Sequence, residues 1–204
     1  AYALFLNTKF KGRSIVRTVI YMPVMIAPLI MGYIMYFLFQ YDGGALNDII
    51  MLLGHEPVDL LANSSATIAI IVMVNSLQFV GVSMVIYLAG LQNVPNMYYE
   101  AAMLDGASSW QRFKHITFPL LMPAISSSTI LNLIGGLKLF DLVMALTSGG
   151  PGFTTHSLST LVTNQYFSAQ SAGYASAIGI FAFLLIMVVS NVVMKFFDKR
   201  EVDV

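Results

Sequence analysis

The chain has 204 residues, of which 57% are hydrophobic and only 10% are charged, whereas roughly 25% are charged in soluble domains. A soluble protein of this size could not bury so much apolar surface, so the composition predicts a membrane protein. The formal net charge of zero argues against nucleic acid as a partner, and the absence of cysteine excludes disulfides and thiol chemistry.

Four long apolar segments are predicted to cross the bilayer as helices, because a span requires about 20 apolar residues. Helix is favoured because lipid offers the backbone no other partner, and the alternation typical of barrel strands is absent. The sequence therefore predicts an all-α membrane protein, a multi-span helical bundle in which residues 1–204 form one domain. The expected spans cover about 18–41, 66–91, 118–147 and 172–194, and Ala1–Leu6 is expected to be the end of a preceding helix.

Two features break up the first part of the chain. Pro23 and Pro28 lie within the first expected span, where a proline removes a backbone hydrogen bond, and they predict a static kink rather than a moving hinge. Between Gly43-Gly44 and Pro57, residues 46–53 predict a short helix at the membrane interface.

Basic residues are distributed asymmetrically, which predicts the orientation of the spans. They gather before the first span, between the second and third, and after the fourth, and these regions alternate correctly to share one side of the membrane. The loops on the opposite side contain no Lys or Arg. A cytoplasmic position is therefore predicted for the C-terminus and for Lys9, Lys11, Arg13, Arg17, Arg112, Lys114, Lys195, Lys199 and Arg200.

Lys138 and Asp141 are the only charged residues inside an expected span. At a spacing of three they are expected on one helix face, where they would pair, either locking this helix to its neighbours or lining a solute path. Asn75, Gln78 and Asn132 are candidate groups for binding solute hydroxyls, and the alternative for each is a hydrogen bond between helices.

The polar segment of about 92–117, between the second and third spans, predicts a compact helix–turn–helix. Asn96–Leu104 is rich in good helix formers, and Gly106 permits a turn that a side chain would obstruct. Ser108 or Ser109 is placed to cap a second short helix over residues 110–115. Such an element would present an acidic group, Glu100, together with apolar side chains to a groove on a soluble partner.

The same segment resembles the cytoplasmic Glu-Ala-Ala loop of permease subunits in binding-protein-dependent ABC importers. That pattern reads Glu-Ala-Ala, three residues, Gly, nine residues, Ile, one residue and Leu-Pro, and every element matches except that Phe118 replaces the Leu. The resemblance implies that this loop docks on a separate ATPase subunit and transmits its motion. The implied coupling residues are Glu100, Ala101, Ala102, Asp105, Gly106, Ile116 and Pro119.

Further segments resemble the carbohydrate-importing branch of that family, such as Leu88–Gln92, Thr147–Gly152 and Gly173–Ala177. The resemblance implies import of a sugar or oligosaccharide across the cytoplasmic membrane by a chain that is N-terminally incomplete. It also implies three partners: ATPase subunits, a second permease that is related or identical, and an extracytoplasmic solute-binding protein.

Signatures of catalysis, cofactor binding and metal binding are absent. No phosphate-binding loop of the Gly-x-x-x-x-Gly-Lys-Ser/Thr type is present, so ATP hydrolysis is expected on a partner and no cofactor is predicted. The three histidines are far apart and have no carboxylate at ligand spacing, so no metal site is predicted.

Three alternatives remain open at this point. The permease would instead import a non-sugar solute such as glycerol phosphate. A secondary transporter driven by an ion gradient would work without any ATPase and would leave the cytoplasmic motif unexplained. A membrane-embedded enzyme would need catalytic groups clustered at one depth, and only Lys138 and Asp141 approach that arrangement.

Overall fold

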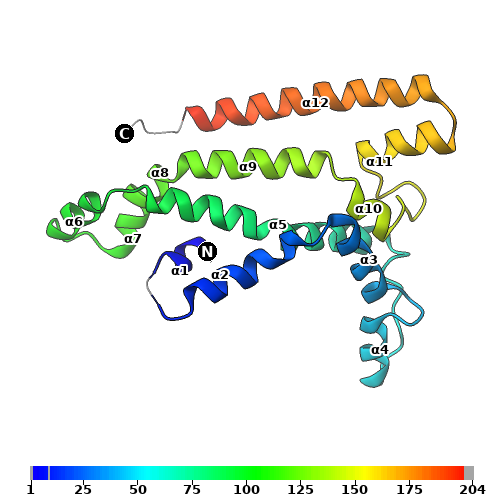
Figure 1. Cartoon of the computed structure of the whole chain (residues 1–204), viewed down its shortest axis with the longest axis horizontal. Coiled ribbons are helices and arrows are strands. Elements are labelled where there is room, and N and C mark those ends of the chain that lie inside the picture. Colours follow the sequence, from blue (N-terminus) through cyan, green and yellow to red (C-terminus); the bar gives the residue numbers. More distant parts are fainter. Residues whose placement is uncertain (1, 9, 200–204) are drawn as a thin grey trace. The chain divides into compact units, whose positions relative to one another are not determined.

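A computed structural model describes residues 2–8 and 10–199, and the regular structure of these residues is entirely helical (Figure 1). In the order of the chain the helices are α1 (Tyr2–Asn7), α2 (Arg13–Tyr21), the 3₁₀ helix η1 (Met22–Met25), α3 (Pro28–Phe39), α4 (Ala45–Leu52), α5 (Ser64–Gln92), α6 (Asn96–Leu104), α7 (Ser109–Arg112), the π-helix η2 (Phe113–Thr117), α8 (Phe118–Leu120), α9 (Met122–Leu137), α10 (Asp141–Leu146), α11 (Leu158–Thr163), the π-helix η3 (Asn164–Ser168) and α12 (Ala172–Asp198).

Two of the helices are long and apolar enough to cross a membrane without interruption. The 29 residues of α5 and the 27 residues of α12 rise about 40 Å each, more than the roughly 30 Å of a hydrocarbon core. They coincide with the second and fourth expected spans. The two other candidates are pairs of helices separated by a bend, so the described residues contain between two and four spans.

The first of these pairs is interrupted at the two prolines. Helix α2 ends at Tyr21, η1 follows, and α3 begins at Pro28, whose missing N–H is harmless in the first turn of a helix. Pro23 and Pro28 therefore end one helix and start another, instead of kinking a continuous one as predicted.

The third expected span is also broken, and the break contradicts the prediction for Lys138 and Asp141. Helix α9 ends at Leu137 and α10 begins at Asp141, so the two charged residues are not on one helix face. A carboxylate at the start of a helix and a cation just beyond the end of another are each favoured by the helix dipoles. Across residues 2–8 and 10–199 no ion pair joins them, and both side chains are exposed.

By their internal packing, the described residues form two compact units. The first takes residues up to Met22, Phe79–Ile134 and residues from Met187 onward, and the second takes Pro23–Gln78 and Gly135–Ile186. The expectation of one domain over residues 1–204 stays a prediction. Two of the residues used to predict orientation, Lys9 and Arg200, lie outside the described part of the chain. The expected N-terminal helix is found as α1, although Ala1 itself lies outside the described residues.

The core of the first unit joins α1 to α5 and to the start of α9. Its buried residues are Ala3, Leu6, Met84, Leu88, Leu91 and Leu121. Helices α5 and α9 approach closely at Gly90, because a Cβ atom there would lie 2.7 Å from Ala124 Cβ. This contact holds α9 in place next to the segment that carries the candidate site.

The core of the second unit is built on the contact between α3 and α10. Its buried residues are Met31, Ile70, Ile71, Val74, Leu142, Val143 and Leu146. At Gly32 the two helices approach so closely that a Cβ atom would lie 2.6 Å from Ala145 Cβ.

In the same unit α4 confirms the short helix expected over residues 46–53. The buried Asn47 side chain fixes α4, because it donates to the carbonyls of Gln40, Tyr41 and Val58 and accepts from Val58 N–H.

Candidate functional site

The predicted helix of the candidate coupling segment is present as α6, and it ends in a turn built by Gly106. Gly106 N–H donates to Met103 carbonyl at 3.1 Å, and Ala107 N–H donates to Ala102 carbonyl at 2.9 Å. This pattern is the Schellman motif, which requires a left-handed residue after the helix. Gly106 has φ +76° and supplies that conformation without the steric penalty that a Cβ atom would bring.

The second helix of the segment begins with a reciprocal cap. Ser108 Oγ accepts from Gln111 N–H at 3.3 Å, and Gln111 Oε1 accepts from Ser108 N–H at 2.7 Å. This capping box satisfies two backbone donors at the start of α7, and it identifies Ser108 rather than Ser109 as the cap. The second predicted helix is therefore confirmed at its start.

Beyond Arg112 the helix widens into the π-helix η2, which sequence reasoning did not foresee. It continues into α8, whose first turn contains Pro119. Tyr99 of α6 shares a hydroxyl–hydroxyl hydrogen bond of 3.0 Å with Thr117, a buried residue of η2. Tyr99 and Thr117 therefore fix the distance between the two arms of the segment, and no local pattern in the sequence pointed to either residue.

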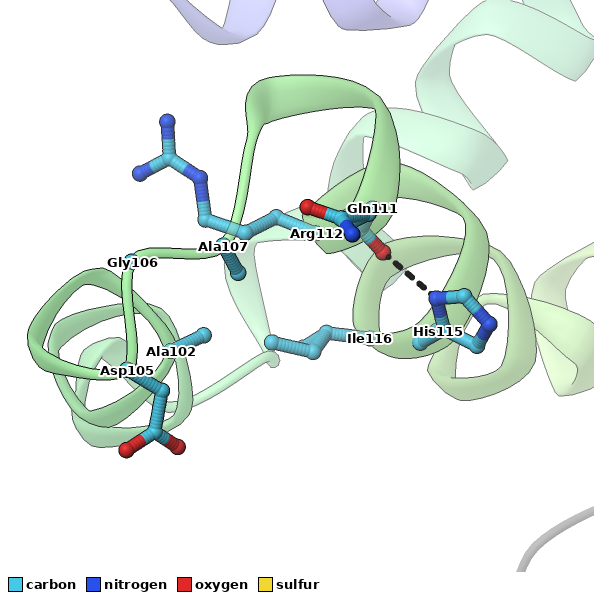
Figure 2. A pocket seen from close by; sticks show the side chains of 8 residues that line it. All are labelled: Ala102, Asp105, Gly106, Ala107, Gln111, Arg112, His115 and Ile116. Atoms are coloured by element: carbon cyan, nitrogen blue, oxygen red, sulfur yellow. Dashed lines mark hydrogen bonds between the residues drawn. The ribbon is translucent and has the colours of Figure 1, made fainter.

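Between the two arms lies an open hollow with a volume of about 410 Å³ (Figure 2). In Figure 2 the small apolar side chains of Ala102, Ala107 and Ile116 point into it. The Asp105 carboxylate and the Arg112 guanidinium are directed away from it. Its lining residues are Ala102, Asp105, Gly106, Ala107, Gln111, Arg112, His115 and Ile116.

The hollow thus brings together four of the seven predicted coupling residues: Ala102, Asp105, Gly106 and Ile116. The other three, Glu100, Ala101 and Pro119, do not line the hollow. Glu100 and Ala101 are exposed on α6.

Large apolar side chains on this segment are exposed. Leu104 at the end of α6 is 90% exposed, and Trp110 on α7 is 69% exposed. The Trp110 ring stacks on Phe113, with 5.6 Å between the ring centroids. Exposed large apolar groups around a preformed hollow are the features of a surface that binds another protein.

Three of the predicted intramembrane polar residues, Gln78, Asn132 and Asn75, differ in the hydrogen bonds that they form. In the second unit Gln78 is 1% exposed, and its Nε2 donates to Ile26 carbonyl at 2.8 Å. In the first unit Asn132 Nδ2 donates to Ser83 Oγ on α5 at 2.9 Å, which confirms a hydrogen bond between helices. Asn75 makes no side-chain hydrogen bond within the described residues.

Gln78 donates a hydrogen bond to a backbone carbonyl that has no helical partner, at the point where the first apolar segment is interrupted. Ile26 lies between η1 and α3, so its carbonyl is outside either helix. The Gln78 amide supplies a donor for that carbonyl, whereas its buried Oε1 has no partner within the described residues. In the part of the chain that the structure describes, no three His, Asp or Glu side chains gather as metal ligands do.

Comparison with known proteins agrees with the helical fold. The trehalose/maltose transport system permease protein MalF of Thermococcus litoralis is 36% identical over 195 residues, which cover 96% of this chain and 66% of the relative. The multiple sugar-binding transport system permease protein MsmF of Streptococcus mutans is 36% identical over 199 residues, which cover 97% of this chain and 68% of the relative. The chain thus spans about two thirds of the length of these relatives.

A solved structure shares the fold. It is a bacterial ABC transporter involved in the import of the acidic polysaccharide alginate, and it matches with a TM-score of 0.85 at 25% identity over 97% of this chain and 70% of that one. The family described as "Binding-protein-dependent transport system inner membrane component" matches residues 1–202. With these matches and its apolar helices, the chain is a membrane-embedded helical protein that belongs to the binding-protein-dependent transport system inner membrane component family.

Proposed function

We propose that this chain is the transmembrane permease subunit of an ATP-driven importer of a sugar or oligosaccharide. The proposal depends above all on the segment formed by α6, the Gly106 turn and α7, whose hollow and exposed apolar side chains suit the docking of a separate ATPase. The choice of solute is supported by the relatives, which are named as trehalose/maltose and multiple-sugar permeases.

The segment is suited to transmit motion because its shape exists before the partner binds. The Schellman turn and the capping box close both arms with local hydrogen bonds, so little ordering is required on docking. The second arm continues through η2 and α8 towards α9. A displacement at the hollow is therefore passed to α9, an apolar helix of the membrane-embedded part.

The complete importer is proposed to contain two permeases, ATPase subunits on the cytoplasmic side and an extracytoplasmic solute-binding protein. The asymmetry of basic residues supports placing the coupling segment and the C-terminus in the cytoplasm. Closure of the ATPases would then shift the permease helices between inward-open and outward-open arrangements, as alternating access requires.

The docking of the ATPase is tested by two substitutions in the segment, Gly106→Val and Glu100→Lys. A β-branched residue at φ +76° costs about 1–3 kcal/mol, so Gly106→Val should distort the turn. Restoring the turn on docking would weaken ATPase binding by up to about 1–3 kcal/mol. Glu100→Lys reverses an exposed charge that would form a charge-assisted hydrogen bond with a basic group on the ATPase. The measurement is co-purification of the ATPase with the membrane-inserted permease, together with ATP hydrolysis stimulated by the loaded binding protein.

Gly54→Val provides a matched control. Gly54 has φ +83° and, like Gly106, has open space where a Cβ atom would lie, so both substitutions strain the backbone similarly. Gly54 follows α4 in a loop that is predicted to lie outside the cell, so Gly54→Val should retain the ATPase. Wild-type ATPase binding in Gly106→Val and Glu100→Lys, or equal loss in Gly54→Val, would contradict the proposed role of this segment.

A further inference from the structure

Helix α4 carries three large apolar side chains on one side, and the described residues leave them uncovered. Ile49, Leu52 and Leu53 are separated by three and four positions, so they gather on the same side at the end of the helix. Their side chains are 54%, 85% and 71% exposed, respectively. Neighbouring exposed apolar groups of this size mark a surface that binds another protein or a membrane. These three residues are called the α4 patch below.

The α4 patch is anchored from the opposite side of the helix. Asn47 lies about half a turn from Ile49, and its side chain is buried. Its Nδ2 donates to Tyr41 carbonyl at 3.2 Å and to Val58 carbonyl at 3.1 Å, and its Oδ1 accepts from Val58 N–H at 2.9 Å. The chain on both sides of α4 is thus tied to the helix, so little ordering is required when a partner binds.

The segment that carries the α4 patch contains acidic residues but no Lys or Arg. Residues 40–63 include four exposed carboxylates, those of Asp42, Asp48, Glu56 and Asp59. The bonds of Asn47 to Tyr41 and Val58 bring the neighbours of these two residues, and so two of the carboxylates, to the base of α4. The sequence has no Lys or Arg between Arg17 and Arg112, and no ion pair within the described residues neutralises the four carboxylates.

These charges decide between the kinds of surface that could cover the α4 patch. A helix that lies on a membrane surface is typically rich in Lys and Arg on its polar side, whereas the polar residues here are acidic. A second copy of this chain would bring carboxylates against carboxylates, which is unfavourable. A protein that presents an apolar contact surrounded by basic side chains satisfies both the patch and the charges.

We propose that the α4 patch is a contact site for the solute-binding protein, whose basic side chains face the surrounding carboxylates. This inference rests on the proposed function, in which that protein approaches from outside the cell. The asymmetry of basic residues supports placing residues 42–65 on that side. The apolar side chains supply most of the affinity, and the carboxylates guide the association of the two proteins. The site is separate from the coupling segment.

The affinity of the complete importer for its solute-loaded binding protein tests the site. The permease is reconstituted in nanodiscs with its ATPase, and binding is followed by surface plasmon resonance. Leu52→Gln/Leu53→Gln should weaken binding at least about tenfold, since a few buried apolar side chains dominate the energy of an interface. Asp48→Lys should mainly slow association and reduce its dependence on salt. Met51→Gln is the matched control, because Met51 is 48% exposed on the other side of α4, and it should bind as the wild type does.

A photo-crosslinking amino acid in place of Leu52 identifies what covers the patch. It should cross-link to the solute-binding protein, and the same group in place of Met51 should not. Every variant should retain the ATPase, because the coupling segment is unchanged. Cross-links only to lipid or to a second permease, wild-type affinity in Leu52→Gln/Leu53→Gln, or an equal loss in Met51→Gln would overturn the site and leave the proposed function standing. A wild-type importer that binds no solute-binding protein would refute the proposed function, and the site with it.

Discussion

The contact between α3 and α10 makes Gly32→Ala an informative substitution. A Cβ atom at position 32 would lie 2.6 Å from Ala145 Cβ and 3.2 Å from Leu142 carbonyl oxygen. Carbon atoms in contact are normally about 3.5–4.0 Å apart, so the helices must separate by about 1 Å. The Ala145 methyl group cannot rotate away, because it is attached directly to the backbone.

The magnitude follows from two opposing effects. Overpacking of a core costs about 1–3 kcal/mol, whereas replacing glycine by alanine within a helix returns up to about 1 kcal/mol. Gly32→Ala should therefore lower the free energy of unfolding by about 0–2 kcal/mol relative to wild type, and by about 1–3 kcal/mol relative to a glycine-to-alanine change at an open helical position. Gly135→Ala is the control, since Gly135 of α9 has open space around its Cβ position, and it should be neutral or slightly stabilising.

Unfolding of the purified permease in mixed micelles, driven by sodium dodecyl sulfate, measures both values. The double variant Gly32→Ala/Ala145→Gly moves the methyl group from one helix to the other and should recover part of the loss. Equal stability of Gly32→Ala and Gly135→Ala, or no recovery in the double variant, would refute the argument from close approach at this position.

Two further predictions concern polar residues. Gln78→Met should lower the free energy of unfolding by about 0.5–1.5 kcal/mol in the same assay, because Ile26 carbonyl loses its donor. A stability of Gln78→Met equal to wild type would contradict a structural role. Lys138→Met and Asp141→Leu should have effects that add within about 0.5 kcal/mol, because Lys138 lies just beyond the end of α9, Asp141 begins α10 and no ion pair joins them. Strong coupling in the double-mutant cycle would contradict this separation.

The coupling segment was predictable because its signals are local. Good helix formers gave α6 its predicted bounds, and Gly106 and Ser108 occupy the positions that the turn and the cap require. The predicted solute-path residues had no such local signal. Gln78 bonds a carbonyl 52 positions earlier in the chain, and this carbonyl is available only because the helix is interrupted there.

The interruptions themselves were not predictable from apolar composition. A long run of apolar residues indicates that a segment lies in lipid, but it does not indicate whether the helix is continuous. The break at Lys138 shows the difference. Two charged residues suggested one helical face, but Lys138 follows the last residue of α9 and Asp141 is the first residue of α10. Pro23 and Pro28 did indicate an irregularity in the first apolar segment, but they predicted a kink rather than the end of one helix and the start of another.

The coupling segment is closed almost entirely by bonds between near neighbours in the chain. The turn at Gly106 and the cap at Ser108 each span six residues or fewer, and His115 Nδ1 bonds Gln111 carbonyl one turn away. The shape of this segment is therefore encoded by a short stretch of the chain. Under the proposed function, substitutions in the membrane helices would be able to change the transported solute while the proposed docking surface stays unchanged. One ATPase type would then be able to serve permeases with different solutes.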